Sequence, residues 1–101
     1  MARYKLVAFS NAVEGHDAEY NEWYDGQHMP DVLAIPGFVS AERFVCVGDG
    51  PHRYLAIYEI ETDDLEGLLA EFSRRPGTDL MPISTSLEFA SAVVGFWKPA
   101  A

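Results

Sequence analysis

Most of the polar side chains able to do chemistry near neutral pH lie between His16 and Phe44, and His28 stands out among them. An imidazole has an unperturbed pKa of about 6.5, so it can give or take a proton near neutrality. The sequence around Pro30 predicts a helix break at His28, from which the ring can turn into a pocket. The alternative is a structural histidine that caps the helix end or bonds to strand backbone. We expect His28 to be the principal acid or base.

Three neighbours in the chain are spaced to assist His28. Asp31, three residues later, can orient the imidazole or take a substrate proton, although it can equally be a first-turn carboxylate after Pro30 that offsets the helix dipole. Tyr24, four residues earlier, shares a helix face with His28 if the helix continues that far. It can place a phenol beside the imidazole, and Trp23 can form a pocket wall. Aromatic core packing is the alternative for both rings.

Three residues of the expected strands can supply binding groups. Arg43 can hold a carboxylate or phenolate oxygen through two hydrogen bonds. Its alternative is a surface ion pair with Glu42 or Glu59, which contributes little to stability. Tyr58 can donate a hydrogen bond from the sheet, and Phe9 can form apolar wall or core. We expect Arg43, Tyr58 and Phe9 to contact a substrate.

Other kinds of site are weakly supported. The spacing of Asp25, His28 and Asp31 is too unspecific to predict a metal site. The serines have no nucleophile-elbow motif, so covalent catalysis by serine is not expected. Cys46 is the single cysteine, which excludes an intrachain disulfide, and we expect it to be a buried small side chain in a strand. We expect neither a metal nor a cofactor.

The elements that must position these residues follow from periodicity and turn signals. Strands are expected at 3–10, 38–47, 54–61 and 86–97. A first helix begins with Asp17 as N-cap and ends or kinks near His28, and a short helical turn follows over 31–34. A second helix begins with Asp63 as N-cap and ends before Pro76. The order βαββαβ predicts an α+β, ferredoxin-like domain over residues 1–101. A four-stranded antiparallel sheet carries both helices on one face.

Composition restricts the partners. The chain has 101 residues, 49% of them apolar, and a formal net charge of −9. Such a charge repels nucleic acid and anionic membrane surfaces. The N-terminal residues lack the apolar run of a signal peptide, and no stretch is long enough to span a membrane. We therefore expect a cytoplasmic protein with no nucleic-acid or membrane partner.

Apolar residues occur on both faces of the third and fourth expected strands. Two helices can cover only one face of the sheet, so the other apolar face marks an interaction surface. We expect a homodimer in which two sheets pack face to face, because two-fold pairing is the commonest assembly.

The phrase EYNEWYDGQHMPDVLAIPGFVSAERF resembles the helix-to-strand segment of EthD-like proteins in the dimeric α/β-barrel superfamily. The matching residues are Trp23, Tyr24, His28, Pro30, Pro36, Gly37 and Phe38. The resemblance implies a ferredoxin-like dimer with a pocket between each sheet and its helices for small, often aromatic molecules. Superfamily activities include cofactorless monooxygenation, cyclisation, isomerisation and lyase or dehydratase chemistry, and no haem ligand carries over.

Together these observations lead to one main hypothesis and two alternatives. The main one is a cofactor-independent enzyme in which His28 moves a proton on a small carbonyl or phenolic compound, giving isomerisation, cyclisation or elimination. Tyr24 or Tyr58 would be its hydrogen-bonding partner. The alternatives are a non-catalytic small-molecule binding or accessory protein and a cofactorless monooxygenase. The sequence does not separate these three.

Overall fold

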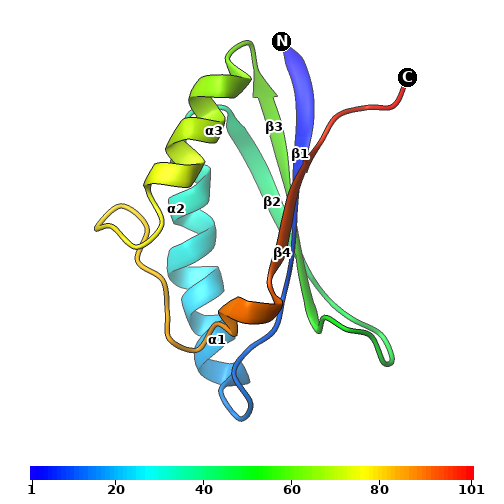
Figure 1. Cartoon of the computed structure of the whole chain (residues 1–101), viewed down its shortest axis with the longest axis vertical. Helices are drawn as coiled ribbons and strands as arrows, with labels where there is room; N and C mark the ends of the chain where they lie inside the picture. The colour runs from blue at the N-terminus through cyan, green and yellow to red at the C-terminus, as the bar shows by residue number, and fades with distance from the viewer.

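The computed structural model describes all 101 residues and has the predicted βαββαβ order (Figure 1). The four strands form one antiparallel sheet, and the helices lie together on one of its faces, so the ferredoxin-like fold is confirmed. The elements are β1 (Ala2–Ser10), α1 (Asp17–Trp23), a π-helical turn (Tyr24–His28), α2 (Met29–Leu33), β2 (Phe38–Val45), β3 (Tyr54–Thr62), α3 (Leu65–Arg74), a short 3₁₀ helix (Phe89–Ser91) and β4 (Val93–Trp97).

The strand order is β2-β3-β1-β4, so the two longest strands lie in the centre and β4 forms an edge. Alternation along β3 points Tyr54, Ala56, Tyr58 and Ile60 toward the helices, and all four are buried. From β1, Leu6 faces the same side, since it pairs directly with Tyr58. These side chains and the helices enclose one hydrophobic core. The core residues are Leu6, Tyr20, Tyr24, Val32, Ile35, Phe38, Tyr54, Ala56, Tyr58, Ile60, Leu68 and Met81.

The first helical segment does not break at His28, and this prediction was wrong. His28 keeps helical dihedral angles of −67° and −49°, and the amide of Met29 bonds to the carbonyl of Tyr24, five residues back. Pro30 has no amide hydrogen, so one backbone hydrogen bond of a regular helix is missing. One turn widens into a π-helix here, and the helix continues instead of ending. Helices α1 and α2 therefore form one continuous segment (Figure 1).

Both expected N-caps are displaced by one residue. His16 precedes α1 as its N-cap, so Asp17 is the first helical residue, and its carboxylate accepts a hydrogen bond from the Tyr54 hydroxyl. In α3 the N-cap is Asp64, whose side chain accepts from the amide of Gly67. Asp63 fails as a cap because the backbone enters helical geometry one residue later, a shift that leaves the position of the helix on the sheet unchanged.

The last expected strand is too long by seven residues. Residues 86–92 contain a single bridge between Leu87 and Ala12 and then the 3₁₀ helix, and only Val93–Trp97 pairs with β1. Asn11 explains the difference, because its side-chain amide donates to Ser91 Oγ and its carbonyl accepts from the amide of Glu88. These contacts hold the segment against the end of β1 as a turn.

Cys46 is exposed just beyond β2, not buried within a strand as expected. Strand β2 ends at Val45, and the following hairpin extends beyond the body of the sheet (Figure 1). A residue in such a hairpin has no second layer above it, so apolar character alone does not bury it.

None of the helices is both long enough and apolar enough to cross a membrane.

Candidate functional site

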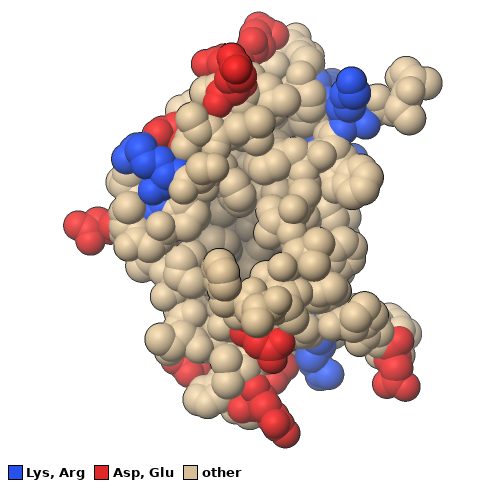
Figure 2. Space-filling view, viewed as in Figure 1, with Lys and Arg blue, Asp and Glu red and all other residues tan.

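A cavity lies between the helix-covered face of the sheet and the helical layer. Its volume is about 70 Å³, and one side opens to the surface beside β4. Figure 2 shows a hollow on this face, surrounded by uncharged atoms, with the charged side chains placed around the margin. The lining comes from β1, the first helical segment, β3, α3 and the 87–94 segment. It consists of Leu6, Ala8, Phe9, Ser10, Trp23, Tyr24, His28, Val32, Tyr58, Phe72, Leu87, Ala92 and Val94.

His28 lines this cavity from the π-helical turn. Because that turn aligns residues five apart, the imidazole stacks on Trp23 with ring centroids 4.7 Å apart and an interplanar angle of 25°. Tyr24 meets the same ring edge-on at 4.9 Å. Burial lowers the pKa of His28 from 6.5 to about 4, an effect opposed by the Asp31 carboxylate and reinforced by Arg43. His28 is therefore neutral at pH 7.

The Nδ1 atom of His28 is buried and has no hydrogen-bond partner. A buried polar atom left unpaired costs about 1–3 kcal/mol, and such atoms are uncommon in folded proteins. The chain has one other, Nε of Arg43, whose guanidinium carbon lies 4.4 Å from the centroid of the Tyr24 ring. Both unsatisfied atoms therefore lie around the same tyrosine.

Two phenols complete the polar part of the cavity wall. The hydroxyl of Tyr58 donates to the hydroxyl of Tyr24 at 3.3 Å, which leaves the Tyr24 proton free for another acceptor. Burial raises the pKa of Tyr24 to about 12 and raises that of Tyr58 as well. Both groups are thus neutral hydrogen-bond donors. Ser10 also lines the cavity, where its hydroxyl is hydrogen-bonded to Tyr20.

Arg43 projects from β2 toward the helices but does not line the cavity. Its guanidinium carbon lies 4.4 Å from the centroid of the Tyr24 ring. One terminal nitrogen donates to Asp25 Oδ1 at 2.8 Å and the other to Asn21 Oδ1 at 2.9 Å. The side chain is 12% exposed. Neither Glu42 nor Glu59 is its partner, and Glu59 pairs with Lys5 instead.

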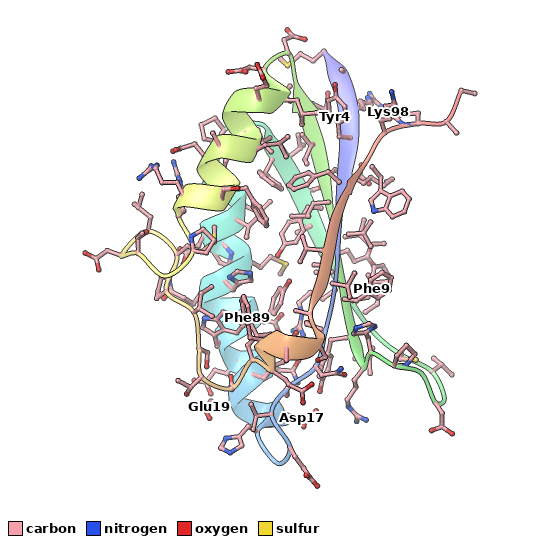
Figure 3. The ribbon with its side chains drawn as sticks, viewed as in Figure 1. Tyr4, Phe9, Asp17, Glu19, Phe89 and Lys98 are labelled. Atoms are coloured by element: carbon pink, nitrogen blue, oxygen red, sulfur yellow. The ribbon has the colours of Figure 1, made fainter.

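The remaining candidates lie at the edge of the site. Asp31 is outside the cavity lining and accepts a hydrogen bond from Gln27 at 2.7 Å. Phe9 contributes to the lining, but its ring points to the opposite face of the sheet, where it packs 5.4 Å from His52 (Figure 3). No group of three His, Cys, Asp or Glu side chains is arranged to hold a metal ion.

The structure therefore places five expected residues in the cavity lining: His28, Tyr24, Trp23, Tyr58 and Phe9. Sequence reasoning missed most of the remaining apolar wall. Val32 could have been found, since it follows His28 by four residues and continues the same helix face. Leu87 and Ala92 could not, because the sequence predicted a strand where the chain forms a turn.

Comparison with protein-family models finds no match, and comparison with curated proteins finds none either. Solved structures do match. An EthD family protein from Bacillus halodurans aligns with a TM-score of 0.59 at 18% identity, over 96% of this chain and 98% of that one. A DABB family protein with a ferredoxin-like fold from Mesorhizobium loti aligns with a TM-score of 0.70 at 9% identity, over the whole of both chains.

A third match is a variant of SnoaB, a cofactor-independent oxygenase from Streptomyces nogalater. Its TM-score is 0.61 at 16% identity, with 100% of this chain and 96% of that chain covered. The protein thus shares a ferredoxin-like fold with these structures. The expected resemblance to EthD-like proteins is confirmed at the level of the fold, which by itself fixes no reaction.

Proposed function

We propose that this protein is a cofactor-independent enzyme that binds a small, uncharged carbonyl or phenolic compound and moves a proton on it at His28. The observation that supports this most is that His28, a residue of the cavity lining, has a buried imidazole nitrogen without a hydrogen-bond partner. A hydrogen-bonding group of a bound compound would pair with this nitrogen. Binding would then remove the free-energy cost of the unpaired atom, which favours the complex. Perturbed titratable groups in cavities are also typical of active sites.

The arrangement of the wall suggests how the step proceeds. Neutral His28 accepts a proton from a carbon next to a carbonyl, or from a phenol. The free hydroxyl proton of Tyr24 is available to the oxygen on which negative charge develops, and Tyr58 supports it from behind. Returning the proton to a different atom completes an isomerisation, while loss of a leaving group or ring closure gives elimination or cyclisation.

The cavity favours an uncharged compound. No charged side chain lines it, and the nearest cation, Arg43, already donates to Asp25 and Asn21. Ligand sites usually measure about 300 Å³ or more, whereas this cavity measures about 70 Å³. A bound compound must therefore extend through the open side. Phe89 lies in the chain between the lining residues Leu87 and Ala92 and is 79% exposed, so it can contact the protruding part (Figure 3).

The experiment follows proton exchange in a probe ketone. In D₂O at pD 7.5, the protein should accelerate loss of the α-proton NMR signal of 2-indanone, an uncharged aromatic ketone. Replacing His28 with Gln should reduce this acceleration by about 100-fold or more, the usual range for a general base. His52→Gln is the matched control, because His52 bonds to Ser91 outside the cavity. Equal exchange by wild type and His28→Gln would refute the assignment.

A second candidate function is cofactor-independent oxygenation, which is favoured by the likeness to SnoaB. Here the same proton transfer would generate an electron-rich anion that reduces O₂. One oxygen atom would enter the substrate at a CH₂ group, converting it to a carbonyl, and the other would leave as water. Oxygen uptake with an anthrone would support this function, whereas turnover that continues without oxygen would support the first. Tight binding of unchanged compound would indicate a non-catalytic binding protein.

We also propose that the protein forms a homodimer through the uncovered face of the sheet. Apolar side chains from all four strands are at least partly exposed there: Val7, Phe9, Phe44, Leu55, Ile57, Val93 and Trp97. The ion pair between Lys5 and Glu59 lies on the same face. The same face of a second copy, related by a two-fold axis, presents the same apolar and charged side chains. Its apolar residues can therefore pack on those of the first copy, and its charged residues can pair with opposite charges.

A further inference from the structure

The guanidinium group of Arg43 is held in place by its hydrogen bonds and by the tyrosine rings around it. Its two terminal nitrogens donate to Asp25 and Asn21 at 2.8 and 2.9 Å, both on the helical segment that carries Tyr24 and His28. Its guanidinium carbon lies 4.4 Å from the Tyr24 centroid and 5.5 Å from those of Tyr20 and Tyr54. With both terminal nitrogens engaged, its side chain 12% exposed and no place in the cavity lining, Arg43 is placed to act on the site through Tyr24 and not by touching substrate.

We infer that Arg43 is a positioning residue that orients Tyr24 and, through its fixed positive charge over that ring, strengthens the Tyr24 hydroxyl as a donor and disfavours the imidazolium form of His28. This inference rests on the proposed function for its role in catalysis. Its electrostatic content can be tested without any substrate.

The direction of the effect follows from charge alone. A cation over the face of a tyrosine is attracted to the ring and stabilises the phenolate relative to the phenol. The same cation destabilises an imidazolium nearby. Removing the charge should therefore raise the pKa of both Tyr24 and His28. Burial, which raises the pKa of Tyr24 and lowers that of His28, is the larger influence on each, and Arg43 acts on both in the direction of a lower pKa.

Other groups around the two rings are few. Tyr58 and Tyr20 act on Tyr24 as neutral phenols, and the Asp25 carboxylate acts on Tyr24 in the direction opposite to Arg43. Asp31 is the carboxylate that acts on His28. No charged side chain of α3 or β4 lines the cavity. Arg43 is thus the one cation that acts on both rings.

The experiment titrates His28 by NMR in the full-length protein, comparing wild type with Arg43→Met and Arg43→Lys. Arg43→Met should shift the His28 titration upward, because a positive charge that disfavours the imidazolium is lost. Arg43→Lys keeps the charge and should restore most of the wild-type titration. If Arg43 acts only through the hydrogen bonds of its planar guanidinium group, Arg43→Lys should shift the His28 titration as much as Arg43→Met does. Identical titrations in all three proteins would overturn the inference.

Asp25→Asn provides a test that does not depend on folding of an Arg43 variant, because the Asp25 side chain is 60% exposed. Losing this carboxylate should lower the pKa of residue 24, which can be followed by ¹⁹F NMR of 3,5-difluorotyrosine incorporated there. An unchanged or raised value would contradict the electrostatic role. If both titrations behave as expected while 2-indanone exchange is absent, the positioning role stands and the proposed reaction fails.

Discussion

Acidification should destabilise this protein through one residue, His28. In the unfolded chain a histidine has a pKa of about 6.5, whereas burial lowers the pKa of folded His28 to about 4. Between these values the unfolded state binds the proton and the folded state does not. The free energy of unfolding therefore falls as the pH falls from about 6.5 to about 4, and the contribution of His28 is fully present above that range.

The magnitude follows from the size of the shift. The difference between about 6.5 and about 4 corresponds to about 3 kcal/mol at full effect. At pH 5, where the unfolded state is almost fully protonated at this site, the loss should be about 2 kcal/mol. That is a large share of the 5–15 kcal/mol that ordinarily stabilises a domain.

Urea unfolding at pH 7.5, 6.0 and 5.0 measures this loss. His28→Gln removes the titrating group, so its free energy of unfolding should fall by about 2 kcal/mol less than that of wild type over the range. His16→Gln serves as the control, because His16 is exposed beside Glu19. Arg74 and Arg75 hold the pKa of Glu71 at about 2, below its ordinary 4.5. The contribution of Glu71 to the free energy of unfolding is therefore lost only as the pH falls below about 4.5, outside the range measured here. Parallel losses in wild type and His28→Gln would refute the burial argument.

Three further predictions concern the fold and the assembly. Gly37 has a φ of 106°, and an added Cβ would lie 2.7 Å from Leu68 Cδ1; Gly37→Ala should therefore lower the urea midpoint more than Gly15→Ala, which has a φ of 80° and open space around it. Equal midpoints would show that Leu68 moves aside at no cost. Replacing Ile57 on the uncovered sheet face with Lys should convert a dimer to a monomer in sedimentation, and a wild-type monomer at micromolar concentration would exclude the dimer. In a Trp97→Phe background, the fluorescence of Trp23 should fall as its stacked partner His28 becomes protonated near pH 4, and a constant signal would place the ring elsewhere.

The order of elements and the buried face of β3 were accessible from the sequence because both depend on short-range pattern. Alternation of Tyr54, Ala56, Tyr58 and Ile60 defines one face wherever the strand lies in the sheet. The π-helical turn was not accessible. Gly26 and Pro30 both predict an end to the helix, and only packing of the residues on either side against the sheet makes a widened, continuous helix preferable. The stacking of Trp23 on His28 depends on this turn, so it was missed as well.

Arg43 illustrates the same limit for side chains. The sequence places an arginine on a strand, and its natural partners by strand neighbourhood are Glu42 and Glu59. Which face it occupies depends on the register of β2 against β3, where pairing with Ala56 directs it to the helices. There it meets Asp25 and three tyrosine rings that no local pattern associates with it.

The burial that keeps His28 neutral also makes it a weak base, and this limits how it can take a proton from a phenol. Transfer leaves an anion beside an imidazolium in a cavity with little water. An opposite charge within about 4–6 Å raises an imidazole pKa by about 1–3 units, so the bound anion itself must make His28 basic. Transfer is then favourable only for a compound seated against the ring.

A coloured phenol tests this coupling directly. At pH 5, 4-nitrophenol is largely the neutral, colourless form in solution, whereas its phenolate absorbs visible light. Bound to the wild-type protein, it should show more phenolate absorbance than the free compound at the same pH, because the imidazolium of His28 stabilises the anion. His28→Gln should bind without this band, while Tyr58→Phe should retain it in weakened form. A bound spectrum equal to that of the neutral phenol would mean that His28 does not receive the proton.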